Sequence, residues 1–202
     1  MAGVERAAQE CQRQDRPAQA AGNVRSACGS RQVSLIWINR DLAELAARWI
    51  AAKENADWLD FNNGAPPSPL AIRVMSQLDA HCIRLFTPDG EDAPIGLVAL
   101  SDIHPRFRSA RLWYVLGDKR YAGGGHTKRS VAELLRMGFQ DLGLESVNAW
   151  VVESNAPSIA ILRANGFRRI GAQRRCHFLD GTPHDRLLFD LLATEFGSRN
   201  DE

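Results

Sequence analysis

The apolar positions of this chain follow two different periods, and each change of period separates a predicted strand from a predicted helix. Residues 33–37 alternate apolar and other residues, as a strand does. Residues 42–50 then place their apolar side chains at helical spacing, and Asp41 is the expected N-cap. Ser68 followed by Pro69 predicts the N-cap and first turn of a second helix. One face of that helix carries Leu70, Val74 and Leu78.

The middle of the chain returns to strand patterns. Residues 81–87, 94–101 and 110–117 read as three consecutive strands, the first two joined by the turn 88–90. A glycine-rich stretch follows, and then an amphipathic helix that Gly143 is expected to end. The apolar stripe of this helix consists of Val131, Leu134, Leu135, Phe139 and Leu142.

The last third of the chain predicts a strand, a short helix and a closing hairpin. Residues 146–152 form a nearly continuous apolar run, of the kind that is buried on both faces. A helix is expected over 156–164, and the runs 168–179 and 184–193 flank the turn 180–183. The order β-α-α-β-β-β-α-β-α-β-β joins a strand meander to a strand–helix–strand crossover. The fold class is therefore α/β (α+β), with a mixed sheet.

Composition narrows the class of protein. The chain has 202 residues, 45% hydrophobic and 24% charged, with a net charge of +1. These values indicate one soluble domain, and they give no reason to expect nucleic acid or a membrane as partner. Residues 1–32 are poor in large apolar side chains and predict a disordered extension, residues 33–196 the folded domain, and residues 197–202 a short polar tail. Without a secretory or membrane-spanning apolar segment, the expected location is the cytoplasm.

The four cysteines are dispersed and give no metal-binding pattern. No pair has CxxC spacing and no histidine lies nearby at ligand spacing, so no metal is expected. Cys82 and Cys176 lie in apolar runs and are expected to be buried, reduced thiols. This usage favours a reducing compartment.

The stretch "RYAGGGHTKR", residues 120–129, is the strongest chemical signal in the chain. It follows a predicted strand and opens a predicted helix. The first N–H groups of a helix lack internal partners, and the helix dipole adds positive charge at that end. Glycines remove the Cβ atoms that would keep an anion away from these amides. The stretch therefore predicts either a flexible connection or an anion site, and a phosphate group is the natural ligand.

Two common phosphate loops do not match this stretch. A Walker loop needs Gly-Lys-Ser/Thr, whereas the chain has Gly125-His126-Thr127. The dinucleotide pattern G-x-G-x-x-G fails because Lys128 stands at the third glycine. An unrelated glycine-rich nucleotide binder stays an alternative, and stabilisation of the chain by ATP would reveal it.

A third pattern fits. Residues 120–125 read as R/Q-x-x-G-x-G/A, and "NAPSIAILRANGF" places Asn155 and Ser158 three apart at the start of a helix that ends in Gly-Phe. With their spacing, these motifs resemble the GNAT superfamily of acyl-CoA-dependent N-acetyltransferases. The resemblance covers roughly residues 33–194. It is greatest to the branch of ribosomal-protein N-terminal acetyltransferases, because residues 171–192 also resemble the C-terminal hairpin of that branch.

The resemblance implies a fold, a donor and a set of binding residues. The fold would be a mixed, mostly antiparallel sheet of about six to seven strands, splayed between strands 4 and 5, with about four flanking helices. Acetyl-CoA would enter the splay as co-substrate and pair with the edge of strand 4, where a bulge is expected to aim one N–H at the thioester. The implied coenzyme A residues are Val115, Leu116, Arg120, Gly123, Gly124, Gly125, His126, Asn155 and Ser158.

The roles of Lys128 and Arg129 stay open, because the family more often has Thr-Glu at these two places. Each is either a phosphate contact or a solvated residue of the first helical turn. Asn155 is likewise an N-cap, a pantetheine ligand, or both.

The catalytic groups are less defined by sequence. A general base is expected near the end of the third predicted strand of the chain, residues 94–101, and in the loop after it, where Asp102 and His104 lie, with Glu153 as a third candidate. Many family members carry a tyrosine as general acid where this chain has Leu162. Ser158, Tyr114 or water could replace it, because a thiolate with a conjugate-acid pKa of roughly 8.5 already leaves readily.

The acceptor amine stays open. Residues 58–69 and 103–110, which include Asn62, Asn63, Arg106 and Arg108, are expected to border its site without a strongly acidic patch. A protein N-terminus, an amino sugar, an amino acid or another small amine would all fit. A non-catalytic acyl-CoA-binding module is the competing hypothesis, which Leu162 favours, and both a monomer and a homodimer are compatible with the family.

Overall fold

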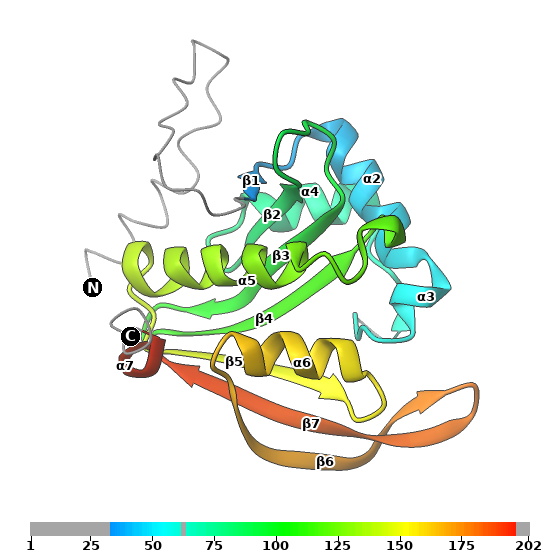
Figure 1. Ribbon diagram of the computed structural model, residues 1–202, viewed down its shortest axis with the longest axis vertical. Coiled ribbons are helices and arrows are strands. Elements are labelled where there is room, and N and C mark those ends of the chain that lie inside the picture. The colour runs from blue at the N-terminus through cyan, green and yellow to red at the C-terminus, as the bar shows by residue number, and fades with distance from the viewer. Residues whose placement is uncertain (1–32, 62–63, 197–202) are drawn as a thin grey trace.

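A computed structural model describes residues 33–61 and 64–196 of the chain (Figure 1). Residues 1–32, 62–63 and 197–202 lie outside the described residues, and with them the expected extension and tail, Cys11, Cys28, Asn62 and Asn63. The seven described strands are β1 Ser34–Ile36, β2 Cys82–Thr87, β3 Gly96–His104, β4 Ser109–Leu116, β5 Ser146–Val152, β6 Arg168–Leu179 and β7 Thr182–Leu192.

One sheet contains all of these strands, in the order β1-β2-β3-β4-β5-β7-β6. Every neighbouring pair is antiparallel except β4 and β5, which are parallel. The parallel pair is joined by a crossover through a helix, as parallel strands require. This arrangement confirms the predicted mixed, mostly antiparallel sheet.

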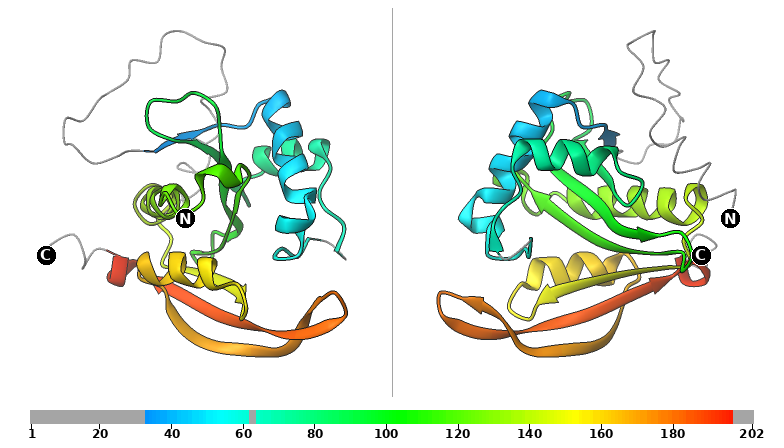
Figure 2. Two further views of the ribbon diagram at one scale, coloured as in Figure 1. Left: turned by 45° about the vertical axis from the view of Figure 1, so that its right-hand side comes forward. Right: turned by 180° about the vertical axis from the view of Figure 1, so that it is seen from behind.

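Helices cover both faces of the sheet (Figure 2). On one face lie α2 (Arg40–Ala51), the short α3 (Lys53–Ala56) and α4 (Pro69–Gln77). On the other lie α5 (His126–Arg136) and α6 (Ala156–Ala164), and α7 (Ala193–Phe196) follows β7. Two separate apolar clusters result: Val115 of β4 packs with α2 and α4, whereas Leu112 packs with α5 and α6. Alternation along β4 thus assigns successive side chains to opposite faces.

Most helix boundaries follow the sequence signals. Ser68 caps α4 by accepting a hydrogen bond from the Ala71 N–H, with Pro69 at the first position, as expected. The expected cap Asp41 is wrong: it lies inside α2, and the side chain of Asn39 accepts from the Leu42 N–H at 2.9 Å. The helix that begins at His126 ends in one turn of π-helix, η3 (Met137–Asp141), closed by a bond from the Leu142 N–H to the Met137 carbonyl. Gly143 then turns the chain in the left-handed region, at φ +65°.

Burial in the structure corrects two expectations, those for the strand at residues 146–152 and for Cys176, and it also shows which side of α4 is buried. The apolar face of α4 formed by Leu70, Val74 and Leu78 is exposed, and Ile72 is the residue that this helix buries. Strand β5 is not buried throughout: Asn148 is exposed and Trp150 is half-buried on one face, although Val152 of the same face is buried. Cys82 is buried as expected, but Cys176 is exposed on the edge strand β6.

The expected bulge in β4 is also wrong. The register of β4 against β3 runs without interruption from Gly96↔Leu116 to Ser101↔Arg111, and the irregularity comes after it, between Ser101 and His104. The extra residue therefore belongs to β3. Asp102 adopts a left-handed φ of +54° there and pairs with Arg111 at 2.8 Å. Within the described residues, no helix is both long and apolar enough to cross a membrane.

Candidate active site

The parallel strands β4 and β5 separate after a short paired stretch, and a cavity opens where they part. Their register includes only Ser109↔Ser146, Ala110↔Val147 and Arg111↔Asn148. Beyond these pairs the two strands flank a cavity of about 630 Å³, which reaches from the glycine loop to α3 and α6. The expected splay between strands 4 and 5 is therefore confirmed.

The backbone of β4 presents unpaired groups to this cavity. The Gly117 N–H donates to the Ile95 carbonyl, on the β3 side. Because successive N–H groups of a strand point to opposite edges, Val115 is also directed at β3, whereas Leu112, Tyr114 and Leu116 face the splay. The Leu116 carbonyl accepts a hydrogen bond from the Lys119 ammonium at 2.8 Å, which agrees with this orientation. Of the two predicted backbone partners, Leu116 faces the gap and Val115 contributes only a buried side chain beside it.

The glycine stretch forms a tight loop before α5. Gly123 and Gly125 have φ of +79° and +73°, a region in which a side chain would be strained. Gly125 is the N-cap of α5, and within the described residues no side chain caps this helix end. Gly123, Gly125, His126, Thr127 and Lys128 all line the cavity. The loop therefore directs an uncapped helix N-terminus into the cavity, as the anion-site prediction requires.

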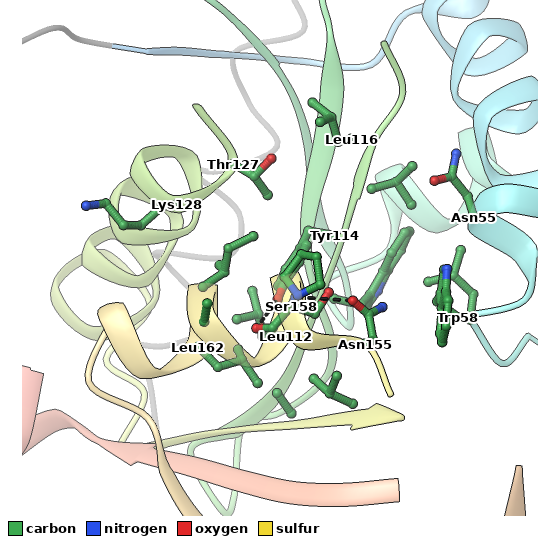
Figure 3. Close-up of a pocket in the computed structure, with 18 of the residues that line it drawn as sticks. Asn55, Trp58, Leu112, Tyr114, Leu116, Thr127, Lys128, Asn155, Ser158 and Leu162 are labelled. Atoms are coloured by element: carbon green, nitrogen blue, oxygen red, sulfur yellow. Dashed lines mark hydrogen bonds between the residues drawn. The ribbon is translucent and has the colours of Figure 1, made fainter. Parts of the chain in front are cut away.

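Arg129 holds this loop from the helix side. Its guanidinium donates to the Gly124 carbonyl at 3.1 Å and lies 3.1 Å from Nδ1 of His126. The His126 ring in turn lies edge-on to Tyr121 and over Gly124, where a Cβ would come within 2.7 Å of the ring. Arg129 thus has a structural contact in the loop. The side chain of Lys128 points away from Ser158 and Tyr114 (Figure 3).

Arg120 stands at the start of the loop and is already paired. Its Nη2 lies 2.6 Å from Oδ2 of Asp118, and Oδ1 of the same carboxylate accepts from the Arg120 backbone N–H at the start of η2 (Lys119–Tyr121). The side-chain hydrogen bond from Arg120 lowers the pKa of Asp118. The Arg120 side chain is 85% exposed, so it lies at the outer rim of the loop and not inside the cavity.

Helix α6 brings the predicted Asn155 and Ser158 to the opposite wall. Asn155 is the N-cap, and its Oδ1 accepts from the Ser158 N–H at 3.2 Å. The phenol of Tyr114 donates to the Ser158 carbonyl at 3.1 Å, so β4 and α6 are joined across the splay (Figure 3). Burial raises the pKa of Tyr114. Leu162, at the family's usual tyrosine position, is fully buried and lines the same cavity.

Lys119 is a cavity residue that the sequence analysis missed. Its ammonium donates to the Leu116 carbonyl and to Oδ1 of Asn55, and so connects the edge of β4 to α3. Asn55 is itself buried and donates to the Trp49 carbonyl at 2.8 Å. Burial lowers the pKa of Lys119. No sequence motif marks this contact, because it depends on the position of a helix of only four residues.

The expected general bases lie outside the cavity lining. Asp102 pairs with Arg111, and Nδ1 of the exposed His104 accepts from the Phe107 N–H within its own turn. Glu153 accepts from the Asp185 N–H at 3.1 Å. The loop arginines are likewise directed elsewhere: Arg108 pairs with Glu145, and Arg106 lies over Phe107. The carboxylates that do line the cavity are Glu54 and Asp60, from α3 and the segment that follows it.

The C-terminal hairpin is joined to the segment after α3 by a polar network. Nε2 of the buried His177 lies 2.7 Å from the Asp57 carbonyl, and its Nδ1 accepts from Arg186 at 3.0 Å. Arg186 also pairs with Asp60 at 2.9 Å and lies over the Trp150 ring at 4.1 Å. The hairpin and the Asp57–Asp60 segment are therefore fixed to one another.

A seven-stranded mixed sheet, opened between parallel strands and carrying an uncapped glycine loop at that opening, defines the GNAT acyltransferase fold. Residues 32–168 match the family described as "Acetyltransferase (GNAT) domain", and the chain belongs to this family. The predicted resemblance is thereby confirmed.

Individual relatives agree with the assignment. Over 105 residues the chain is 30% identical to the uncharacterized N-acetyltransferase p20 of Bacillus licheniformis, which covers 52% of this chain and 58% of that protein. It is 24% identical over 98 residues to the uncharacterized N-acetyltransferase YoaA of Bacillus subtilis, covering 48% of this chain and 55% of that one. The chain thus spans little more than half the length of these relatives.

Solved structures share the fold. Mycobacterium smegmatis RimJ, in complex with CoA-disulfide, has a TM-score of 0.67 at 24% identity, covering 82% of this chain and 84% of RimJ. Spermidine N-acetyltransferase from Vibrio cholerae, in complex with CoA and spermine, has a TM-score of 0.71 at 18% identity and covers 82% of this chain and 98% of its own.

Proposed function

We propose that this protein transfers an acetyl group from acetyl-CoA to a primary amine by direct attack within a ternary complex. The observation that carries the proposal is the continuous cavity that joins the uncapped α5 N-terminus to the unpaired edge of β4. An anion site and an open strand edge in one cavity match a ligand with a pyrophosphate at one end and an extended amide chain at the other. The CoA complexes of RimJ and of the spermidine enzyme, which share the fold, support this donor.

The residues fit the donor in two places. The amides of Gly123 to Thr127 would bind the pyrophosphate, and the loop backbone is open at Gly123, where a Cβ would meet no other atom within 4 Å. The pantetheine arm would pair with the outward backbone groups of β4, at Leu116 and Tyr114, opposite Asn155 and Ser158. Arg120 would reach the phosphates only by leaving Asp118, so its contribution is an outer contact.

The chemistry needs a neutral amine and a leaving thiolate. The amine nitrogen attacks the thioester carbonyl carbon, the C–N bond forms, the C–S bond breaks, and the surplus amine proton ends on the thiolate or in water. A backbone N–H of the β4 edge, at Leu116 or Tyr114, would stabilise the negative charge that develops on the carbonyl oxygen. Ser158 lies on the wall where the thiolate would leave, and Tyr114 orients that wall through its hydrogen bond.

The general base is the least defined part of the proposal. An α-amine has a pKa of about 8, so about one molecule in ten is neutral at pH 7, whereas a lysine side chain with a pKa of about 10 is neutral about once in a thousand. Asp102 and His104, which do not line the cavity, are placed for an indirect role. Glu54 does line the cavity, and its carboxylate would act either as the general base or as the group that binds the substrate ammonium.

The acceptor is a small amine or a protein N-terminus, and release of free thiol from acetyl-CoA by the purified chain tests the proposal. Turnover that depends on an added amine, with the acetylated amine identified by mass, supports it. Leu162 in place of the usual tyrosine favours the second candidate, an acyl-CoA-binding module without turnover. Tight binding of acetyl-CoA without thiol release from any amine would favour that module over the enzyme.

A further inference from the structure

The α3 side of the cavity is lined by aromatic rings. Trp58 and Phe61 come from the segment after α3, Trp113 from β4 and Trp150 from β5. Trp113 packs with the cluster under α2 and α4, on the face of the sheet opposite α5 and α6. Ala149 and Val151 point to the α5 and α6 face, so Trp150 between them points to the same side as Trp113. We refer to these four residues as the aromatic box.

Three of the four rings of the aromatic box, those of Phe61, Trp113 and Trp150, are held in place by contacts within the chain. Phe61 and Trp113 meet edge to face, with centroids 5.0 Å apart, and Nε1 of Trp113 donates to the Ser101 hydroxyl at 2.8 Å. The Trp150 ring is covered by the Arg186 guanidinium at 4.1 Å. Fixed rings lose little side-chain freedom when a flat ligand packs against them, which favours such a ligand.

The charges around the aromatic box are mostly neutralised. Asp60 pairs with Arg186 at 2.9 Å, and Arg111 pairs with Asp102 at 2.8 Å. The Lys119 ammonium donates to Asn55 and to the Leu116 carbonyl. Of the two carboxylates that line the cavity in the described part of the chain, Asp60 is paired with Arg186, whereas Glu54 forms no ion pair within 4.0 Å and interacts with the Lys119 ammonium through charge alone.

We infer that the acceptor is a small primary monoamine carried on an aromatic group, an arylalkylamine, with its ring in the aromatic box and its amine beside Glu54 at the mouth of the splay. This inference rests on the proposed function and names its substrate class. A polyamine brings two or more ammonium groups, and each needs its own carboxylate in a partly buried site. An aromatic monoamine needs one carboxylate, and its ring gains ring–ring contacts in addition to the burial of its apolar surface.

A thiol-release assay with the full chain and acetyl-CoA distinguishes the candidates. The panel contains tryptamine and phenethylamine as aromatic monoamines, butylamine as the amine without a ring, spermidine, an aminoglycoside and a short peptide with a free N-terminus. We expect kcat/KM for the aromatic monoamines to exceed that for butylamine at least about tenfold, as one or two ring contacts allow. Spermidine, the aminoglycoside and the peptide should be poorer still.

Variants of the aromatic box link the preference to its residues. Trp58→Leu and Trp150→Leu should each lower kcat/KM for tryptamine about tenfold and leave that for butylamine and the affinity for coenzyme A unchanged. Phe178→Leu is the matched control, because Phe178 is an exposed aromatic residue of β6 outside the cavity lining. Equal losses for tryptamine and butylamine would indicate a structural effect and overturn the box.

The two proposals fail in different ways. Butylamine, spermidine, the aminoglycoside or the peptide as the best acceptor would overturn the arylalkylamine inference and leave the acetyltransferase proposal standing. Binding of acetyl-CoA with no thiol release from any amine of the panel would overturn the acetyltransferase proposal itself.

Discussion

The phenol of Tyr114 donates a hydrogen bond to the main-chain carbonyl of Ser158 at 3.1 Å, and so joins the unpaired edge of β4 to the first turns of α6. This bond crosses the part of the sheet where no strand-to-strand hydrogen bonds are available, because the β4–β5 pairing ends at Arg111 and Asn148. The two walls of the cavity are therefore held at a fixed separation by a side chain.

Tyr114→Phe should remove this link with little change in shape. We expect the free energy of unfolding to fall by about 1 kcal/mol at neutral pH, the net value of one hydrogen bond. The raised pKa of Tyr114 adds a pH dependence. The unfolded phenol loses its proton near pH 10, whereas the folded one keeps it, so the wild type loses stability as the pH rises above about 10. Denaturation at pH 8 and pH 11 should show a smaller alkaline loss in the variant; an equal loss would contradict the assignment.

Gly124→Glu should block coenzyme A binding. The backbone of Gly124 is not in the left-handed region, so a side chain is tolerated there once the His126 ring moves. The new carboxylate would meet the pyrophosphate, and like-charge juxtaposition costs several kcal/mol, so the affinity should fall at least about 100-fold. Gly171→Glu, at another glycine without positive φ and with open space around it, is the matched control. Calorimetric titration with coenzyme A measures both, and unchanged affinity of Gly124→Glu would contradict the loop assignment.

Gly117→Ala tests the connection between the end of β4 and α2. A Cβ at this position would come within 2.1 Å of the Trp49 ring, so the ring has to move out of the cluster under α2. We expect a loss of about 1–3 kcal/mol in the free energy of unfolding, typical of overpacking, with a change in tryptophan fluorescence. Gly171→Ala, where the nearest atom is 4.0 Å away, should show neither change.

Arg186→Lys should not be a conservative substitution. The guanidinium bonds to His177, pairs with Asp60 and lies over Trp150 at the same time, and a lysine ammonium cannot keep all three contacts. We expect about 1–3 kcal/mol of destabilisation by thermal unfolding, since it leaves Nδ1 of the buried His177 without its donor. Arg174→Lys on the exposed edge of β6 is the control and should unfold like the wild type. Equal stability of the two variants would show that the network contributes nothing.

Asp102→Asn and His104→Ala separate a direct base from a structural residue. A positioned general base contributes about 10²–10⁴ in rate, but neither residue lines the cavity, so we expect less than about a threefold change in kcat/KM. Asn tolerates the left-handed conformation at position 102, so the bulge should survive.

Glu54→Gln should lower kcat/KM for a cationic amine by more than Asp102→Asn or His104→Ala does. A hundredfold loss in Asp102→Asn, measured by thiol release, would restore Asp102 as the base.

The sequence was sufficient for the parts of the fold that depend on local patterns. Short stretches of sequence are enough to predict the changes of period, helix caps such as Ser68 and the glycine loop, and the structure contains each of these features. The prediction of Asp41 as the N-cap was wrong because Asn39 and Asp41 are both suitable cap residues. Only the backbone conformation, which is extended at Asn39, decides between them. The bulge was expected in β4 and lies in β3, because strand register depends on pairing and not on either strand alone.

The site was predictable on its donor side and much less on its acceptor side. Gly123, Gly125, Asn155 and Ser158 belong to two short motifs, and the structure brings these four residues to one cavity, whereas Gly124 is not part of its lining. Lys119, Asn55 and the aromatic box meet through contacts between segments far apart in sequence, such as Trp150 with Arg186. No periodicity reports such contacts, so the side that decides the amine could not be deduced from the chain alone.

The division of side chains along β4 has a consequence for how such a protein changes in evolution. Leu112 belongs to the face shared with α5 and α6, and Trp113 belongs to the face shared with α2 and α4. Substitutions around α3 and the hairpin can therefore reshape the acceptor site while the glycine loop and α6 stay unaltered. If the proposed donor and acceptor sites are correct, a gene duplicate could acquire a new amine without first losing its donor, because the two recognition tasks would be carried by opposite faces of one sheet.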